Sequence, residues 1–387
     1  MRKILFVSST PLSKKTFDGK EKRALSILKS LSKKNKVDVI CIDQNKSINK
    51  KKIHFCNNEI RFQINLFQRF FNTLNSLFHL KPMQNGYFYS KEMFNFIENN
   101  KDRYDVIIFH LIRCAQYLPP DFTGLKILEM TDLISIRDQQ IIKRLSIINP
   151  LKYLYILERF LIKRYEKLVS NKFDKIVFIS KKELYEAKTF IDKGKIEVIE
   201  NIFKVEKNIF KFKKNNNKII FLGNINYIPN KLACFDFVKN ILPIINKKYP
   251  DITFNIIGKI NFLDKLYLKS QSNTIIHGPV TNLEMSFKNS ICGICNVNIA
   301  TGFQNKILNY MSYGLPTITS AESFDKSTFK KNKDILVYSK KSELVKFVLR
   351  LKEDKKLSYK LSRNSFNTTK NKFKFSKIYM KYQKILK

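Results

Sequence analysis

Residues 3–42 are KILFVSSTPLSKKTFDGKEKRALSILKSLSKKNKVDVICI, in which two apolar runs enclose a loop and an amphipathic stretch. The apolar runs, 4–8 and 37–42, are typical of strands that are buried on both faces of a parallel sheet. The loop contains Pro11 and ends near Gly19, and apolar residues then recur at helical spacing. The segment therefore predicts a strand–helix–strand unit with two parallel strands.

The same alternation continues along the chain and stops once, at the polar, asparagine-rich residues 204–217. Two successive runs of this kind predict an α/β protein with two Rossmann-like, doubly wound domains that face each other across a cleft. We expect domains at residues 1–203 and 204–370, and a final amphipathic helix at 371–387 that packs back on the first domain. The further predicted strands cover residues 104–109, 126–129, 175–180, 196–199, 219–222, 253–257, 274–277, 291–296 and 317–319.

Residues 301–316, TGFQNKILNYMSYGLP, predict one short helix. Gly314, followed by Pro316, is typical of a helix end. Lys306 lies in the first turns, where the helix dipole disfavours a cation unless an anion is bound there. Either Lys306 and backbone N–H groups near Gly302 bind a phosphate, or Lys306 is a surface lysine. A different face is apolar and expected to be buried, and it carries Phe303, Ile307, Tyr310 and Met311.

The chain has 387 residues, a hydrophobic fraction of 44% and a formal net charge of +41. Such a charge favours anionic partners and salt-sensitive binding. Three explanations of the charge are possible. They are nucleic-acid binding, binding to an anionic membrane surface, and a compositional bias toward lysine, asparagine and isoleucine. The aromatic residues mostly occupy core-like spacings, which disfavours nucleic acid. No apolar run reaches the roughly 18 residues of a transmembrane helix, so we expect a cytoplasmic protein that at most lies on the inner face of a membrane.

The cysteines and acidic residues give no metal motif. Six cysteines occur, most of them in apolar runs, and CGIC at 292–295 is a single CxxC pair without a nearby histidine. Buried free thiols in a reducing compartment are therefore a better interpretation than a zinc or redox site. The sequence also lacks an Asp-x-Asp triplet for a divalent cation and a GxxxxGK[ST] loop, so we expect neither a metal ion nor a nucleotide triphosphatase.

Residues 65–82 predict a helix with more apolar surface than an exposed helix needs. In one interpretation its apolar face packs against the first domain. In the other, it is an interfacial membrane helix with Arg61, Arg69 and Lys81 on its rim. The apolar residues are Leu66, Phe67, Phe70, Phe71, Leu74, Leu77, Phe78 and Leu80.

Several polar or flexible residues follow predicted strands, where a doubly wound fold binds its ligands. In the second domain, Gly223 and Asn224 follow a strand and Lys231 begins the next helix, so that they could converge with Lys306 on a diphosphate. In the first domain, His110 and Asp132 stand at the ends of two strands. A histidine there could orient a substrate or transfer a proton near neutral pH, and a structural hydrogen bond is the alternative.

The chain resembles a family 4 (group 1) glycosyltransferase of the GT-B fold over most of its length. The resemblance rests on the order and spacing of segments, namely LEMTDLIS (128–135), FIS (178–180), IEN (199–201), FLGNINYIPN (221–230), HGPV (277–280) and residues 302–316. It implies transfer of a sugar, of the hexosyltransferase type, from a nucleotide-diphosphate sugar to a polysaccharide or a lipid-linked glycan. The family usually retains the anomeric configuration and uses no metal or other cofactor.

The resemblance also implies roles for individual residues. His110 would contact the transferred sugar, and Lys306 would pair with the donor phosphate. The family often has two glutamates, eight residues apart, at the positions of Thr301 and Asn309. Because asparagine bonds a ribose hydroxyl without charge, a catalytically impaired GT-B protein is one alternative. A basic nucleic-acid-binding protein, which the net charge and the aromatic content allow, is another. The implied substrate contacts are Gly19, Asp132, Gly223, Asn224, Lys231, Val280, Thr301, Gly302, Gln304 and Asn309.

Overall fold

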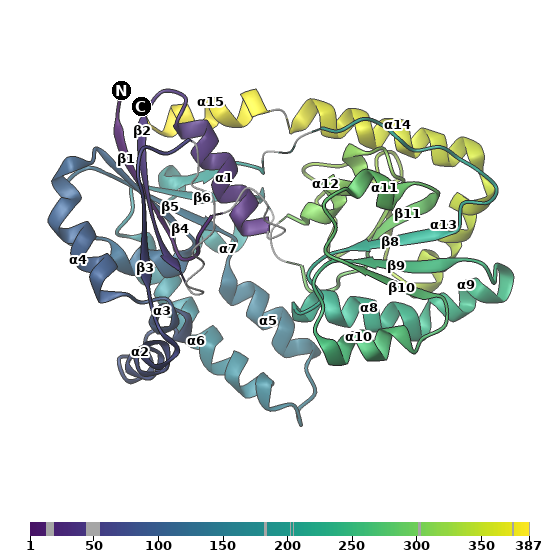
Figure 1. Ribbon diagram of the computed structural model, residues 1–387, viewed down its shortest axis with the longest axis horizontal. Helices are drawn as coiled ribbons and strands as arrows, with labels where there is room; N and C mark the ends of the chain where they lie inside the picture. Colours follow the sequence, from purple (N-terminus) through teal and green to yellow (C-terminus); the bar gives the residue numbers. More distant parts are fainter. Residues whose placement is uncertain are drawn as a thin grey trace. The chain divides into compact units, whose positions relative to one another are not determined.

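The computed structural model describes residues 1–12, 19–43, 55–181, 184–201, 203, 205–300, 303–373 and 375–386. The chain divides into unit 1, which comprises Met1–Ile202 and Ser376–Lys387, and unit 2, which comprises Phe203–Phe375. Each unit contains one parallel sheet with helices packed on it (Figure 1). The predicted α/β class with two such sheets is confirmed. Of the helices that the structure describes, none is long and apolar enough to cross a membrane.

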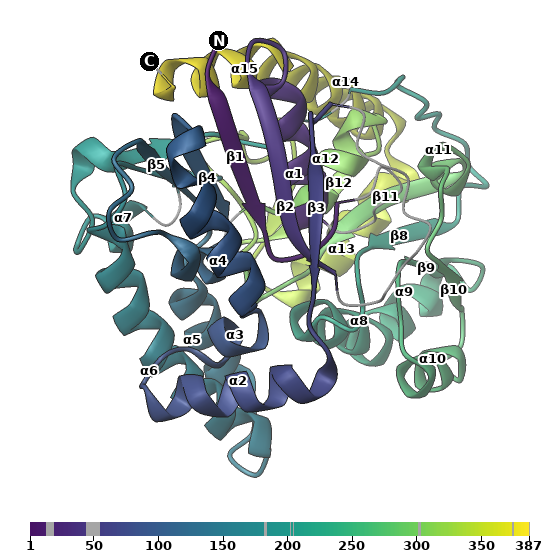
Figure 2. The same cartoon turned by 60° about the vertical axis from the view of Figure 1, so that its left-hand side comes forward.

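Unit 1 has a seven-stranded parallel sheet in the order β3-β2-β1-β4-β5-β6-β7. Ser8 of β1 pairs with His110 of β4, and His110 pairs with Glu129 of β5, so the carboxyl ends of these strands meet at one edge. Figure 2 shows β1, β2 and β3 side by side. The strands are β1 (Lys3–Ser8), β2 (Lys36–Asp43), β3 (Glu59–Gln63), β4 (Val106–His110), β5 (Leu125–Thr131), β6 (Lys175–Phe178) and β7 (Ile196–Val198).

Alternate side chains of these strands enter two apolar clusters, which is the pattern of a sheet covered on both faces. Leu5 and Val7 belong to one cluster, whereas Ile4 and Phe6 belong to the other. Tyr382, near the end of the chain, lies in the second cluster. The helices of unit 1 are α1 (Gly19–Leu31), α2 (Leu66–Phe78), α3 (Met83–Tyr87), α4 (Lys91–Asn100), α5 (Ile134–Arg144), α6 (Pro150–Ser170), α7 (Leu184–Ala187) and α15 (Phe375–Ile385), with a 3-10 helix η2 (Ile112–Tyr117).

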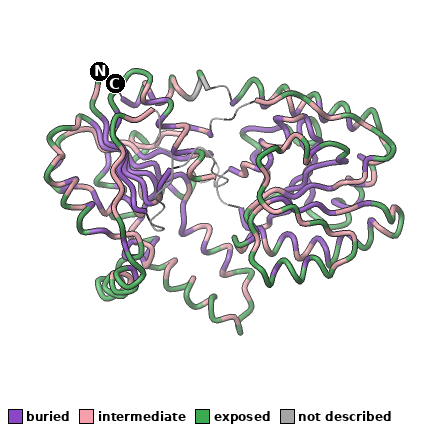
Figure 3. The backbone as a smooth tube through the Cα atoms, viewed as in Figure 1, coloured by how far each residue is buried: buried purple, intermediate pink, exposed green. Residues whose placement is uncertain are grey.

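Unit 2 has a six-stranded parallel sheet in the order β10-β9-β8-β11-β12-β13. Figure 3 shows that its strands are largely buried, while much of the surrounding helical surface is exposed. The strands are β8 (Lys218–Leu222), β9 (Thr253–Ile257), β10 (Thr274–Gly278), β11 (Ser290–Cys295), β12 (Thr317–Ser320) and β13 (Leu336–Tyr338). The helices are α8 (Ile228–Asn240), α9 (Leu242–Lys248), α10 (Phe262–Lys269), α11 (Leu283–Phe287), α12 (Asn305–Ser312), α13 (Lys341–Glu353) and α14 (Lys355–Lys372).

Two helices differ from interpretations of the sequence. Lys231, expected to begin a helix, lies inside α8, and a second helix, α9, follows because Pro243 has no backbone N–H to continue the hydrogen-bond ladder. The apolar face of α2 does not pack against unit 1, since most of its large side chains are exposed. Arg69, expected on the rim of that face, is buried.

Candidate functional site

Lys306 is the central side chain of the candidate site in unit 2. It lies in the first turn of α12 and is only 7% exposed, so the interpretation of a surface lysine is wrong. Its Nζ donates a 2.7 Å hydrogen bond to Asn230 Oδ1 and lies 4.0 Å from the centre of the Phe221 ring. Burial lowers the pKa of Lys306, and no carboxylate of the described chain offsets this effect. The ammonium is therefore held in a low-dielectric site without an anionic partner.

Two glycines allow close packing around the carboxyl ends of β8 and β9. A Cβ at Gly223 would lie 2.9 Å from Asn230 Nδ2 and 3.4 Å from Lys306 Nζ. Gly258, which follows β9, has a φ of +145°, and a Cβ there would lie 1.8 Å from the carbonyl oxygen of Gly223. Asn230 Nδ2 also donates to the carbonyl of Asn224 at 2.8 Å. The structure thus brings together Gly223, Asn224 and Lys306, and adds Asn230, at the carboxyl end of β8.

Tyr310 fixes α12 against the sheet. Its hydroxyl donates to the carbonyl of Ile294 at 3.2 Å and accepts from the N–H of Leu222 at 2.7 Å. The helix can approach β11 closely because Gly293 has no side chain, and a Cβ there would lie 2.4 Å from the Tyr310 ring. The expected apolar face of α12 is buried, and Gly314, at a φ of +71°, follows its end as expected. Lys306 therefore stands on a helix with a fixed position in unit 2.

The other residues expected around the donor have different surroundings. Gln304 precedes α12, and the Asn309 amide donates to the carbonyl of Asn305 at 3.0 Å. Val280 packs against the apolar cluster that contains Tyr310. Lys231 does not join Lys306, because its Nζ pairs with Asp264 Oδ1 at 2.5 Å. Thr301 and Gly302 lie outside the described residues.

Cys292 and Cys295 are free and buried in β11. Residues three apart in a strand point to opposite faces of the sheet, so these two thiols cannot share a ligand. Burial raises the pKa of the Cys292 thiol, which is therefore unreactive. Within the described chain, no group of three His, Cys, Asp or Glu side chains is arranged to hold a metal ion.

In unit 1, His110 ends β4 and is 2% exposed. Its ring stacks on Phe6, with the ring centres 5.8 Å apart, and the backbone of Lys20 lies within hydrogen-bonding reach of the imidazole. Burial, with repulsion from Arg23 and Arg113, lowers its pKa to about 3. A pKa this low disfavours proton transfer near neutral pH, so the structure favours a neutral ring that orients a bound hydroxyl.

The backbone is strained beside His110, at the carboxyl ends of β4 and β5. Leu111 has a φ of +74° and Thr131 has a φ of +69°, which side chains of these types rarely adopt. The Thr131 hydroxyl donates to Asp132 Oδ1 at 2.8 Å. Such strain is concentrated at functional sites, and here it lies next to two residues that the sequence singled out. Gly19 is the first residue of α1 and is half-buried.

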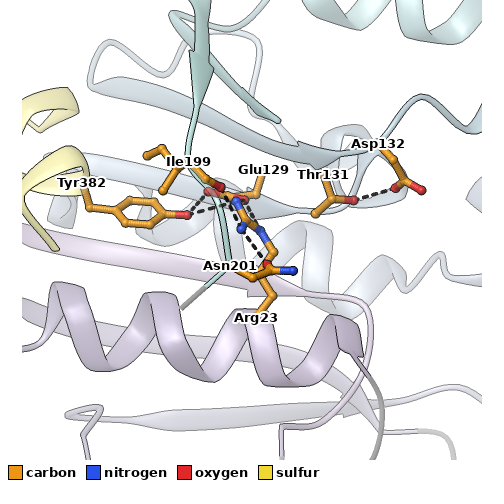
Figure 4. Close-up of polar contacts among 7 residues, drawn as sticks. All are labelled: Arg23, Glu129, Thr131, Asp132, Ile199, Asn201 and Tyr382. Atoms are coloured by element: carbon orange, nitrogen blue, oxygen red, sulfur yellow. Dashed lines mark hydrogen bonds and ion pairs between the residues drawn. The ribbon is translucent and has the colours of Figure 1, made fainter. Parts of the chain in front are cut away.

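Unit 1 also contains a buried polar network that the sequence did not predict (Figure 4). Arg23 of α1 pairs with Glu129 of β5, with 2.8 Å between Nη2 and Oε2, and also donates to Ile199 O and Asn201 Oδ1. The Tyr382 hydroxyl of α15 donates to Glu129 Oε1. The network connects four segments that are distant in the sequence. Neither Asn230 nor this network has a local sequence signal, because each depends on pairing between remote elements.

Residues 216–354 match the sequence model of the family described as Glycosyl transferases group 1. No curated protein matches the chain at a significant level. Among solved structures, a variant of S. aureus TarM in complex with fondaparinux, alpha-GlcNAc-glycerol and UDP is 11% identical, with a TM-score of 0.70 and 100% of each chain covered. Anabaena HepE with UDP and glucose is 13% identical, with a TM-score of 0.68 and coverage of 100% of this chain and 99% of HepE. Sucrose-phosphate synthase from Thermosynechococcus elongatus is 13% identical, with a TM-score of 0.72 and coverage of 100% and 98%.

Proposed function

We propose that this chain, which has the GT-B fold and a group 1 glycosyltransferase domain at residues 216–354, transfers a sugar from a nucleotide-diphosphate sugar to a glycan or lipid-linked acceptor. The single observation that carries the proposal is the buried Lys306 ammonium, which has no carboxylate partner among the described residues and lies beside Gly223. A buried cation of this kind is matched by a multiply charged anion. The UDP in the HepE and TarM complexes is an anion of that type.

Lys306 would act by stabilising the leaving diphosphate. When the bond between the anomeric carbon and the phosphate oxygen breaks, negative charge grows on the diphosphate. An ammonium that is already positioned in a low-dielectric site stabilises that charge without reorganisation. The proposed reaction retains the anomeric configuration and needs no metal, because Lys306 supplies the compensating charge.

Asn230 and Gly223 have supporting roles in this proposal. Asn230 Oδ1 holds the Lys306 ammonium at 2.7 Å and thereby fixes the direction of its remaining N–H groups. Gly223 lets the Asn230 amide and the Lys306 ammonium lie against the backbone at the end of β8, since a Cβ there would crowd Asn230. In unit 1, neutral His110 would hydrogen-bond the transferred sugar or the acceptor through a ring nitrogen.

A thermal-shift screen against UDP, GDP, ADP and CMP tests donor binding, because a ligand of the folded state raises the melting temperature with occupancy. We expect one nucleoside diphosphate to raise it and the monophosphate to have a much smaller effect. Release of that diphosphate from its nucleotide sugars then tests turnover. Absence of any diphosphate-dependent shift contradicts the proposal, whereas binding without turnover supports the catalytically impaired alternative.

A further inference from the structure

Helix α2 is amphipathic, but its apolar face is exposed and its polar face packs against unit 1. Phe67 is 71% exposed and Phe78 is 85% exposed, whereas Arg69 is 5% exposed. Figure 3 shows most of this helix as exposed backbone at one side of unit 1. The exposed apolar residues lie along one side of the helix and are Leu66, Phe67, Phe70, Phe71, Leu74 and Phe78.

The inner face of α2 is held in place by polar contacts. Arg69 Nη2 donates to the carbonyl of Ile64 at 3.1 Å, and its guanidinium lies over the Tyr87 ring. Asn72 Nδ2 donates to the carbonyl of Tyr89 at 3.1 Å. Helix α3 approaches so closely at Gly86 that a Cβ there would lie 2.1 Å from the carbonyl oxygen of Asn72. These contacts fix the orientation of α2, so the outward apolar face is a built feature of unit 1.

A second apolar surface lies on the same side of unit 1, on α6 and the loop before it (Figures 1 and 2). Ile148 in that loop is 91% exposed. Glu158 of α6 accepts a 2.7 Å hydrogen bond from the N–H of Met83 in α3, which connects the two surfaces through α3. The exposed apolar residues of this second surface are Ile147, Ile148, Leu151, Tyr153, Leu154, Ile156, Leu157 and Phe160. Exposed apolar area of this extent marks an interaction surface.

The charges around these residues are of one sign. Residues 60–91 and 139–157 contain no Asp or Glu. The two glutamates of α6 face inward, because Glu158 bonds α3 and Glu166 is buried against Ser135. The exposed cations on and beside these helices are Lys81, Lys143, Arg144, Lys163, Arg164 and Lys167. A second copy of a chain with a net charge of +41 would be repelled here, whereas an anionic surface would be attracted.

We propose that the outward faces of α2 and of the first half of α6 dock this protein on a lipid bilayer that contains anionic headgroups. The phenylalanine and leucine side chains enter the boundary between headgroups and acyl chains, and the flanking lysines and arginines contact the phosphates. This docking surface lies wholly in unit 1 and does not depend on Lys306 or on any nucleotide.

The test is co-sedimentation of the full chain with vesicles of one-third phosphatidylglycerol and two-thirds phosphatidylcholine. The double variant Phe67→Ser/Phe71→Ser removes two exposed rings of α2. The matched control, Phe262→Ser/Leu263→Ser, removes two apolar side chains of α10 in unit 2 that are at least as exposed. We expect wild-type and control protein to bind, and the α2 variant to bind about a hundredfold more weakly. Binding of the wild type should weaken in high salt and on pure phosphatidylcholine.

Three results overturn the proposal. They are failure of the wild type to bind the anionic vesicles, equal binding by the α2 variant, and a dimer of the wild type that this variant dissociates. Melting temperature verifies that each variant is folded. A nucleotide-induced thermal shift, unchanged in the α2 variant, separates failure of this surface from failure of the donor site.

Discussion

The Lys306 ammonium donates a 2.7 Å hydrogen bond to Asn230 Oδ1, and this pair connects α12 to α8 at the carboxyl end of β8. The amide oxygen orients the cation but cannot neutralise it. A buried charge without a counter-charge lowers the stability of the fold, but it strongly stabilises an anion that binds beside it. The arrangement gives Asn230, which the sequence did not single out as a site residue, a role in orienting Lys306.

Gly223→Ala tests the space beside this pair. The new methyl group would meet Asn230 Nδ2 at 2.9 Å and Lys306 Nζ at 3.4 Å, so Asn230 must shift and its hydrogen bond to Lys306 is disturbed. We expect the affinity for a nucleoside diphosphate to fall by about tenfold, the effect of one displaced hydrogen bond, in isothermal titration. Gly194→Ala is the control, because its Cβ would meet no atom closer than 3.7 Å. Equal affinities for the two variants would show that Gly223 does not border the ligand.

Asn309→Glu tests the departure from the family pattern. Asn309 lies three residues after Lys306 on α12 and is half-buried, with its amide bonded to the carbonyl of Asn305. A carboxylate there would accept a stronger hydrogen bond from a ribose hydroxyl than the neutral amide does. We therefore expect nucleoside diphosphates to bind about tenfold more tightly. Asn309→Gln adds length without charge and should leave the affinity unchanged. The same gain in both variants would assign the effect to side-chain length instead.

Glu166→Gln tests a buried carboxyl in unit 1. Burial raises the pKa of Glu166 to about 7, although the hydroxyl and N–H of Ser135 donate to it. A raised carboxyl pKa means that the folded state binds the proton more tightly, so stability is lost as pH rises from about 4.5 to about 7. The variant has no titrating carboxyl at this position, so it does not lose stability in this way as the pH rises. Its stability relative to wild type should therefore increase by roughly 3 kcal/mol between pH 4 and pH 8, as measured by urea unfolding. A difference that does not vary with pH would contradict the assignment.

Arg23→Met tests the buried network in Figure 4. It leaves Glu129 buried and without its cation, which should cost about 3–5 kcal/mol of unfolding free energy. Lys381 lies on the same helix as Tyr382 and forms a partly exposed ion pair with Glu200. Lys381→Met removes this pair and should cost less than about 1 kcal/mol of unfolding free energy. Comparable losses in the two variants would show that the network contributes little beyond surface charge.

Much of the fold could be predicted because its strands are continuous apolar runs, such as 4–8 and 291–296, that have no other stable placement. The sequence missed β3 because EIRFQ is half-buried and polar, and missed β13 because it has only three residues. For α2, the spacing predicted an amphipathic helix but could not show which face points outward. That choice depends on contacts such as Asn72 with Tyr89, which join separate segments.

The candidate site was partly predictable for a similar reason. Lys306 and Gly223 have positional signals, one at a helix start and one after a strand. Lys231 has the same kind of signal, yet its ammonium pairs with Asp264 of α10, and nothing local in the sequence predicts that pair. Asn230 gave no signal in a chain rich in asparagine, because its role depends on a lysine 76 residues away.

The most direct measurement is titration of the preferred nucleoside diphosphate into Lys306→Met and Lys352→Met. Each lysine lies beside an aromatic ring in unit 2, but Lys352 is only half-buried. Lys352 also donates to the carbonyls of Lys214 and Asn216, at 2.9 and 2.7 Å, and its Nζ lies 3.9 Å from Asp251 Oδ2. We predict that Lys306→Met binds about a hundredfold more weakly and melts no lower than wild type, because a penalised charge is removed. Lys352→Met should melt lower and bind normally. Wild-type affinity in Lys306→Met would contradict the account.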